Sequence, residues 1–127
     1  MKKEITVHFL NGDNAGIEMH YLEKQYRNDV IVQIDAKYYE VYFFVEDLLH
    51  YEMTGDGYFS LPGLIVLNAM STDKILKALA GLVKTGYFNW FKGHEQIPYN
   101  KSFADAWYVK NGSGFDESLL MSRKLEV

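Results

Sequence analysis

Apolar and polar side chains alternate along two segments near the start of the chain. Residues 5–9 place Ile, Val and Phe at every second position, and residues 17–21 do the same with Ile, Met and Tyr. Between them, residues 11–14 read Asn-Gly-Asp-Asn, which are residue types that tolerate the positive φ angles of tight turns. A period of two with such a turn predicts a β-hairpin.

The same period of two returns further along. Val30, Val32 and Ile34 alternate with polar residues, and residues 39–45 continue the alternation after a short link. This predicts a second hairpin, and with the first one an antiparallel meander of about four strands. One face of the meander is expected to be packed, while the other carries Glu40, Tyr42 and Phe44, an aromatic set for an exposed face.

Three further segments extend the predicted architecture. Residues 46–53 favour a short helix, because Asp47 suits a first helical turn and the following leucines are not in strand order. Residues 64–67 form a continuous apolar run, which predicts a central or covered strand, and residues 106–109 predict another short strand. The last dozen residues are mostly polar, so we expect fraying or a docked partial helix there.

The clearest helix is predicted over residues 72–85. Ser71 or Thr72 can cap it, its apolar residues recur at helical spacing, and Gly86 provides a left-handed stop. Its opposite face carries three lysines and Gly81, a residue that costs a helix about 1 kcal/mol relative to Ala. The aromatic residues 87–91 that follow are expected to close the bottom of the core. The chain is thus predicted to be a single α+β domain over residues 1–127, with an antiparallel sheet of about five strands packed against this helix.

Composition narrows the class of protein. A hydrophobic fraction of 48% in 127 residues can build a core, and the lack of cysteine excludes disulfides and thiolate metal sites. The N-terminus lacks the apolar stretch of a secretory signal, and no run approaches the ~20 apolar residues of a membrane span. We expect a cytoplasmic protein without membrane contact. The net charge of −4 also argues against direct nucleic-acid binding, which requires a basic face.

The negative charge is concentrated in the middle of the chain. Residues 35–56 carry six acids and one base, whereas residues 1–34 carry five acids and four bases. Tyrosines are interleaved with these acids, and tyrosine offers contact area at low entropy cost while carboxylates steer cations. We therefore predict a partner-binding surface there. Its predicted residues are Glu40, Tyr42, Glu46, Asp47, Tyr51, Glu52, Asp56 and Tyr58.

The sequence evidence for catalytic or metal-binding residues is weaker than that for the partner-binding surface. In the predicted first hairpin, His8 and His20 can lie opposite each other with Glu18 diagonal to them, a set that can hold a divalent ion. Two surface histidines are the preferred interpretation. Glu46 and His50 would share one helix face, although no nucleophile accompanies them. The sequence thus predicts no catalytic residue, no metal and no cofactor.

Three segments together resemble a known class of protein: Tyr38-Tyr39-Glu40-Val41-Tyr42-Phe43, Leu61-Pro62-Gly63-Leu64-Ile65-Val66, and the capped helix from Ser71 to Lys84 ending in Gly86-Tyr87-Phe88. They resemble small bacterial immunity proteins of polymorphic toxin systems, including contact-dependent growth inhibition. The similarity covers about residues 30–91. It implies a cytoplasmic α+β domain that binds and blocks a cognate toxin domain, commonly a basic nuclease, and it carries over no catalytic motif.

Two other classes remain open at this stage. A small α+β enzyme or ligand-binding domain predicts a pocket between sheet and helix, lined by Tyr and His. A self-associating protein predicts a homodimer in which Glu40, Tyr42 and Phe44 pack on a second copy.

Overall fold

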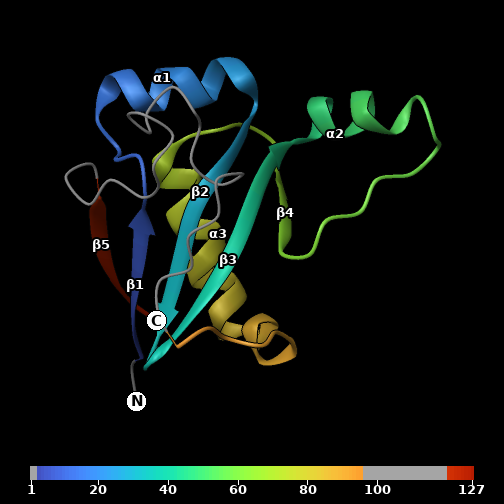
Figure 1. Cartoon of the computed structure of the whole chain (residues 1–127). Helices are drawn as coiled ribbons and strands as arrows, with labels where there is room; N and C mark the ends of the chain where they lie inside the picture. The colour runs from blue at the N-terminus through green and yellow to red at the C-terminus, as the bar shows by residue number, and fades with distance from the viewer. Residues whose placement is uncertain (1–2, 96–119) are drawn as a thin grey trace.

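The computed structural model describes residues 3–95 and 120–127, and these fold as one mixed sheet with helices (Figure 1). The predicted α+β class is confirmed, with most strand pairs antiparallel. The predicted strand at 106–109 lies outside the described residues. In chain order the elements are β1 (Glu4–Phe9), α1 (Ala15–Lys24), β2 (Tyr26–Ile34), β3 (Lys37–Val45), α2 (Glu46–Met53), β4 (Leu64–Leu67), α3 (Thr72–Lys84), the 3-10 helix η1 (Tyr87–Trp90) and β5 (Met121–Glu126).

The sheet order is β4-β3-β2-β1-β5. The predicted second hairpin is confirmed: β2 and β3 pair antiparallel, with Val32 opposite Tyr39 and Ile34 opposite Lys37. A bulge between Arg27 and Val30 shifts the register of this pair. β4 is the exception in direction, because it runs parallel to β3 and therefore needs the long crossover that contains α2.

The main core lies on one face of the sheet. Alternate residues of the inner strands point to this face and are almost completely buried, as the period of two requires. Ile17 and Tyr21 of α1 and Ile75 and Leu79 of α3 belong to the same cluster of buried side chains. In Figure 1, α3 lies behind the sheet and α1 lies across one end of it. The sheet members of the cluster include Ile5, Val7, Phe9, Val30, Val32, Val41 and Phe43.

The predicted first hairpin is wrong, because residues 15–24 form the helix α1. Asn14 caps this helix by accepting a hydrogen bond from the Ile17 amide at 3.0 Å, and Gln25 ends it in the left-handed region at φ 62°. Ile17 and Tyr21 are buried, whereas Met19 between them is 54% exposed. A spacing of four fits a helix as well as it fits alternate strand positions, so the apolar pattern alone did not separate the two. His8 and His20 are consequently not cross-strand neighbours.

Three other expectations also need correction. β4 is an edge strand with Val66 44% exposed, not a central or covered one. Residues 121–126 form the strand β5 and neither fray nor form a helix. After α3, Phe88 is buried and Tyr87 and Phe91 pack against the core, but Trp90 is 89% exposed. Because η1 is a single 3-10 turn, it cannot direct all of its aromatic side chains to one side.

A buried ion pair joins the β1–α1 turn to β2. Arg27 donates from Nε to Asp29 Oδ1 at 2.7 Å, and also donates to the carbonyl of Gly12. The Asn11 amide donates to Asp29 Oδ2 at 3.0 Å. The guanidinium lies 4.5 Å and 4.6 Å from the ring centroids of Phe9 and Tyr21. Both charged side chains are therefore paired and hydrogen bonded, which is the condition for keeping them inside a core.

Candidate functional site

The second half of the acidic segment 35–56, from Glu46 onward, belongs to a projecting arm. We call residues 46–63, which comprise α2 and the segment leading to β4, the α2 arm. Figure 1 shows it extending to one side, away from the inner strands and from α3. α2 has no buried residue, so it covers little of the sheet. The arm carries Glu46, Asp47, Glu52 and Asp56 and contains no Lys or Arg.

The outward face of α2 combines charge and aromatic area. Glu46, Asp47, His50 and Tyr51 are all exposed, and their spacing places them next to one another on one helix face. Leu48, by contrast, is half-buried. Glu46 and Asp47 also lie in the first turn, where the helix dipole stabilises negative charge. These two carboxylates therefore face solvent, and α2 contains no Lys or Arg to pair with them.

The two predicted tyrosine anchors of the arm are free of the core. Tyr51 is 71% exposed and Tyr58 is 73% exposed. Asp56, near Tyr58 in the segment after α2, is exposed too. The apolar rings of these two tyrosines are therefore in solvent and do not contribute to the core. Exposed aromatic area of this kind is typical of contact surfaces.

Tyr42 and Glu52 meet at a small pocket under α2. The pocket has a volume of about 260 Å³ and lies between α2 and the face of the sheet opposite the main core. Phe44 in its wall stacks on Phe59 at 5.3 Å between centroids. Its lining residues are Lys24, Tyr26, Asn28, Tyr42, Phe44, Leu48, Glu52 and Leu61. The volume is below the ~300 Å³ at which small-molecule sites usually begin, and it suits one protein side chain.

Partial burial at this pocket changes the pKa of the Tyr42 phenol. Burial, and secondly the negative charge of Glu40, raise the pKa of Tyr42 to about 12. The phenol therefore stays protonated at neutral pH and can donate a hydrogen bond.

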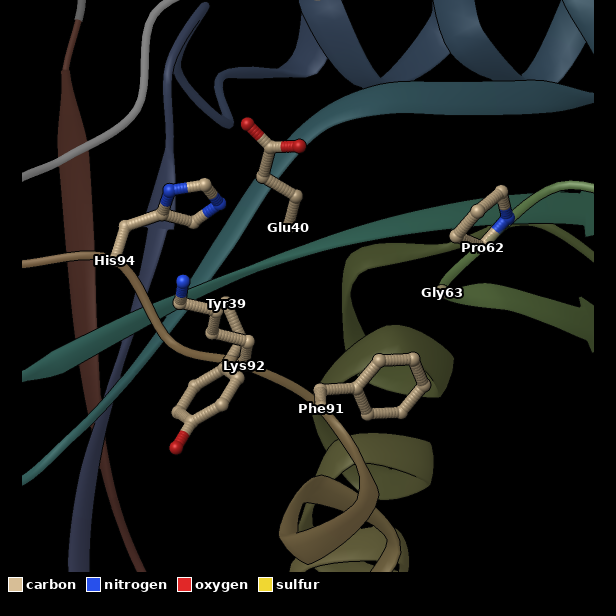
Figure 2. Close-up of a pocket in the computed structure, with 7 residues that line it drawn as sticks. All are labelled: Tyr39, Glu40, Pro62, Gly63, Phe91, Lys92 and His94. Atoms are coloured by element: carbon tan, nitrogen blue, oxygen red, sulfur yellow. The ribbon is translucent and has the colours of Figure 1, made fainter.

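Glu40 lies away from α2, at a different pocket to which the last two residues of the arm, Pro62 and Gly63, contribute. This pocket, of about 140 Å³, is lined by Tyr39, Glu40, Pro62, Gly63, Phe91, Lys92 and His94 (Figure 2). In Figure 2 the carboxylate of Glu40 and the ring of His94 are on one side of β3, and the ring of Tyr39 is on the other. Burial raises the pKa of Glu40, and the nearby His94 opposes that shift. Of the predicted site residues, Glu40 is the one that neither belongs to the arm nor lines the pocket under α2.

The histidine hypothesis for a metal does not fit the geometry. His8 on β1 is buried, and its Nδ1 and Nε2 lie 2.7 Å and 2.8 Å from Ser122 Oγ and Gln33 Oε1. His20 lies on α1. Within residues 3–95 and 120–127 no group of three or more His, Asp or Glu side chains is arranged to hold a metal ion.

On the sheet side of the pocket under α2, Tyr42 was a predicted site residue and Phe44 was expected on this face without being assigned to the site, whereas Tyr26 and Asn28 were not predicted. Their positions depend on the bulge in β2 and on how α2 folds back, and no local pattern encodes either. Where the sheet packs on the middle of α3, core side chains fill the space in which a small enzyme was expected to have its pocket: Phe43, Ile75 and Leu79 are fully buried there.

No family model, curated protein or solved structure matches this chain. Among the described residues, none of the helices has the length and apolar character needed to cross a membrane.

Proposed function

We propose that this chain is an immunity protein that acts in the cytoplasm and neutralises a cognate, basic protein toxin domain by binding it through the α2 arm. The observation that supports this most is the composition of the arm in its exposed setting. It carries four carboxylates, no Lys or Arg, and two tyrosines that are more than two-thirds exposed.

The charge balance of the chain supports the choice of partner. The whole chain has 13 bases and 17 acids, and the arm alone has four acids and no base. The rest of the chain therefore has 13 of each and no formal net charge. A nuclease groove must attract phosphate, so an inhibitor with one local excess of carboxylates has the charge that such a groove selects.

The arm also offers two kinds of contact that a protein partner uses. Glu46 and Asp47 on the outward face of α2 can pair with Lys or Arg, and Tyr51 and Tyr58 provide broad apolar anchors. The pocket beside Tyr42 and Glu52 can receive one side chain from the partner. Glu40 lies away from this surface, so the proposal does not depend on it.

The test first identifies the partner: the proposal expects a large secreted protein to be encoded next to this chain, and the C-terminal domain of that protein is then used as the toxin domain. Wild-type protein should bind this domain and restore growth to cells that express it. In Glu46→Gln/Asp47→Asn the affinity at low salt should fall at least about tenfold, which corresponds to ~1.4 kcal/mol of binding free energy. At high salt the difference should shrink, because exposed charges are screened.

A matched control is Glu4→Gln/Asp35→Asn, which removes the same charge from exposed positions at the other end of the sheet. This variant should bind like the wild type. Absence of binding by the wild-type protein, or equal losses in the two double variants, would reject the α2 arm as the toxin-binding surface.

A further inference from the structure

The strand β4 presents an unprotected edge. It is the outermost strand on its side of the sheet, and among the described residues it pairs only with β3. Its four residues, Leu64–Leu67, are all apolar, and Val66 is 44% exposed. Natural proteins usually protect such edges with charge, proline or a covering element, because the free backbone groups pair readily with another strand.

A groove runs along this edge, between β4 and α3. Its volume is about 450 Å³, and its lining residues are Ile65, Val66, Lys77, Ala78, Gly81, Leu82 and Thr85. On the helix side the lining includes two small residues, Ala78 and Gly81, beside Lys77 and Leu82. An added strand would lie about 4.8 Å from β4, and every second side chain of that strand would point toward α3. The groove is located where those side chains would be.

Gly81 has no role that the described part of the molecule explains. It lies inside α3, is exposed, and a Cβ atom built on it would contact nothing within 4 Å. Glycine in a helix interior is unfavourable, since it adds backbone entropy to the unfolded state. A position that tolerates a side chain, yet has none, leaves space for an approaching chain.

From this edge, groove and glycine we infer that β4 accepts an extended segment of a partner protein by strand addition. The segment pairs with the free backbone groups of β4 and places alternate apolar side chains over Ala78 and Gly81. This surface is separate from the α2 arm, so the inference does not depend on the proposed function.

The positive charge beside the groove indicates which kind of partner segment binds there. Lys77 lines the groove, and within residues 3–95 and 120–127 it makes no ion pair. Lys74 and Lys84 lie on the same side of α3. If two copies paired through β4 about a two-fold axis, their α3 helices would share one face of the joined sheet and bring these lysines together. A partner segment that carries an acidic side chain near Lys77 avoids this repulsion and gains an ion pair.

The test selects binders from a displayed library of random ten-residue peptides against the full chain. Selected peptides should alternate apolar residues and carry an acid. Their synthetic forms should shift the amide NMR signals of Leu64–Leu67. In Gly81→Gln, where the new side chain enters the groove, their affinity should fall at least about tenfold.

The control is Gly55→Gln, an exposed glycine with nothing within 4 Å in the segment after α2. It should bind the selected peptides like the wild type. Circular dichroism should show that Gly81→Gln remains folded, because glutamine is a better helix former than glycine. Failure to enrich any peptide, equal binding by Gly81→Gln, or signal shifts confined to other elements would overturn the inference. A concentration-dependent dimer joined through β4 would also overturn it and assign the edge to a second copy.

Discussion

At the scale of single residues, Arg27 and Asp29 form an ion pair inside the core. Both side chains are almost fully buried, and together with Gly12 and Asn11 they connect β2 to the turn before α1. Removing one partner leaves an uncompensated charge in the core, which is more costly than the loss of the pair itself.

We therefore expect Asp29→Ala to lower the free energy of unfolding by about 3–5 kcal/mol. Arg27→Met should lose a similar amount. The double variant Arg27→Met/Asp29→Ala should lose clearly less than the sum, because each single change isolates the other charge. Urea denaturation of the four proteins measures this coupling. Simple additivity would show that the two charges do not stabilise each other.

A second prediction at the scale of single residues concerns the pKa of Tyr42. The folded pKa of about 12 lies above the ordinary value of 10.0, so the folded protein keeps the phenol proton that the unfolded chain loses. Stability contributed by this group is complete below pH 10 and is lost as the pH rises through 12. NMR of the Tyr42 ring should show ionisation near 12, and Glu40→Gln should lower this pKa by removing a negative charge. Ionisation near 10 would contradict the desolvation of the pocket wall.

At the scale of elements, Gly63 fixes the start of β4. It adopts φ +78°, and a Cβ atom there would lie 2.6 Å from the backbone oxygen of Glu40. Its carbonyl accepts a hydrogen bond from the Tyr42 amide at 2.9 Å. This close approach of two backbones needs a residue without a side chain.

Gly63→Ala should therefore lower the free energy of unfolding by more than the ~1–2 kcal/mol that a left-handed conformation costs alanine. Gly57→Ala is the matched control, since Gly57 has φ +81° with nothing within 4 Å of an added Cβ. It should lose only that conformational cost. Thermal unfolding of both variants gives the comparison, and equal losses would exclude a steric role for Gly63.

The helices and strands also show how much of the fold could be predicted from the sequence. The second hairpin, the short helix after it and the helix ending before Gly86 followed from local periodicity and capping residues, and the structure contains all three. Residues 15–24 were misassigned because Ile17 and Tyr21, four residues apart, satisfy both periods, and Met19 between them fits the strand period although it is exposed on α1. The strand β5 was missed because its pairing partner is more than a hundred residues away, and its own sequence is polar.

At the scale of the whole molecule, the candidate site was predictable in composition but not in shape. The excess of acids over residues 46–56 could be counted in the sequence, and the structure gathers these residues on one arm. The distance of Glu40 from α2 could not be predicted, because it depends on how the crossover after β3 is arranged in space. Glu40 lies in the middle of β3, whereas α2 follows the end of that strand. The pocket beside Tyr42 depends likewise on long-range packing.

Segregated charge has a kinetic consequence for the molecule as a whole. With the formal net charge confined to the α2 arm, a basic partner is attracted toward that side, so the encounter is oriented. The association rate constant with the proposed toxin domain should fall steeply as ionic strength rises, while the dissociation rate constant changes less. Stopped-flow measurements from about 0.05 M to 0.5 M salt, across which the screening length shrinks severalfold, would test this. A salt-independent association rate would argue against electrostatic attraction.

The pairing of β1 with β5 has a consequence for how the protein is made. β1 is an inner strand, and the Lys3 and Val127 backbones exchange hydrogen bonds of 2.6 Å and 2.7 Å. During translation β1 leaves the ribosome before β5, because more than a hundred residues separate these two neighbouring strands. Until β5 emerges, one side of β1 resembles an open sheet border, which other nascent chains can join. A premature stop before β5 should thus yield aggregates cleared by proteolysis, and not a shortened protein that keeps part of its activity.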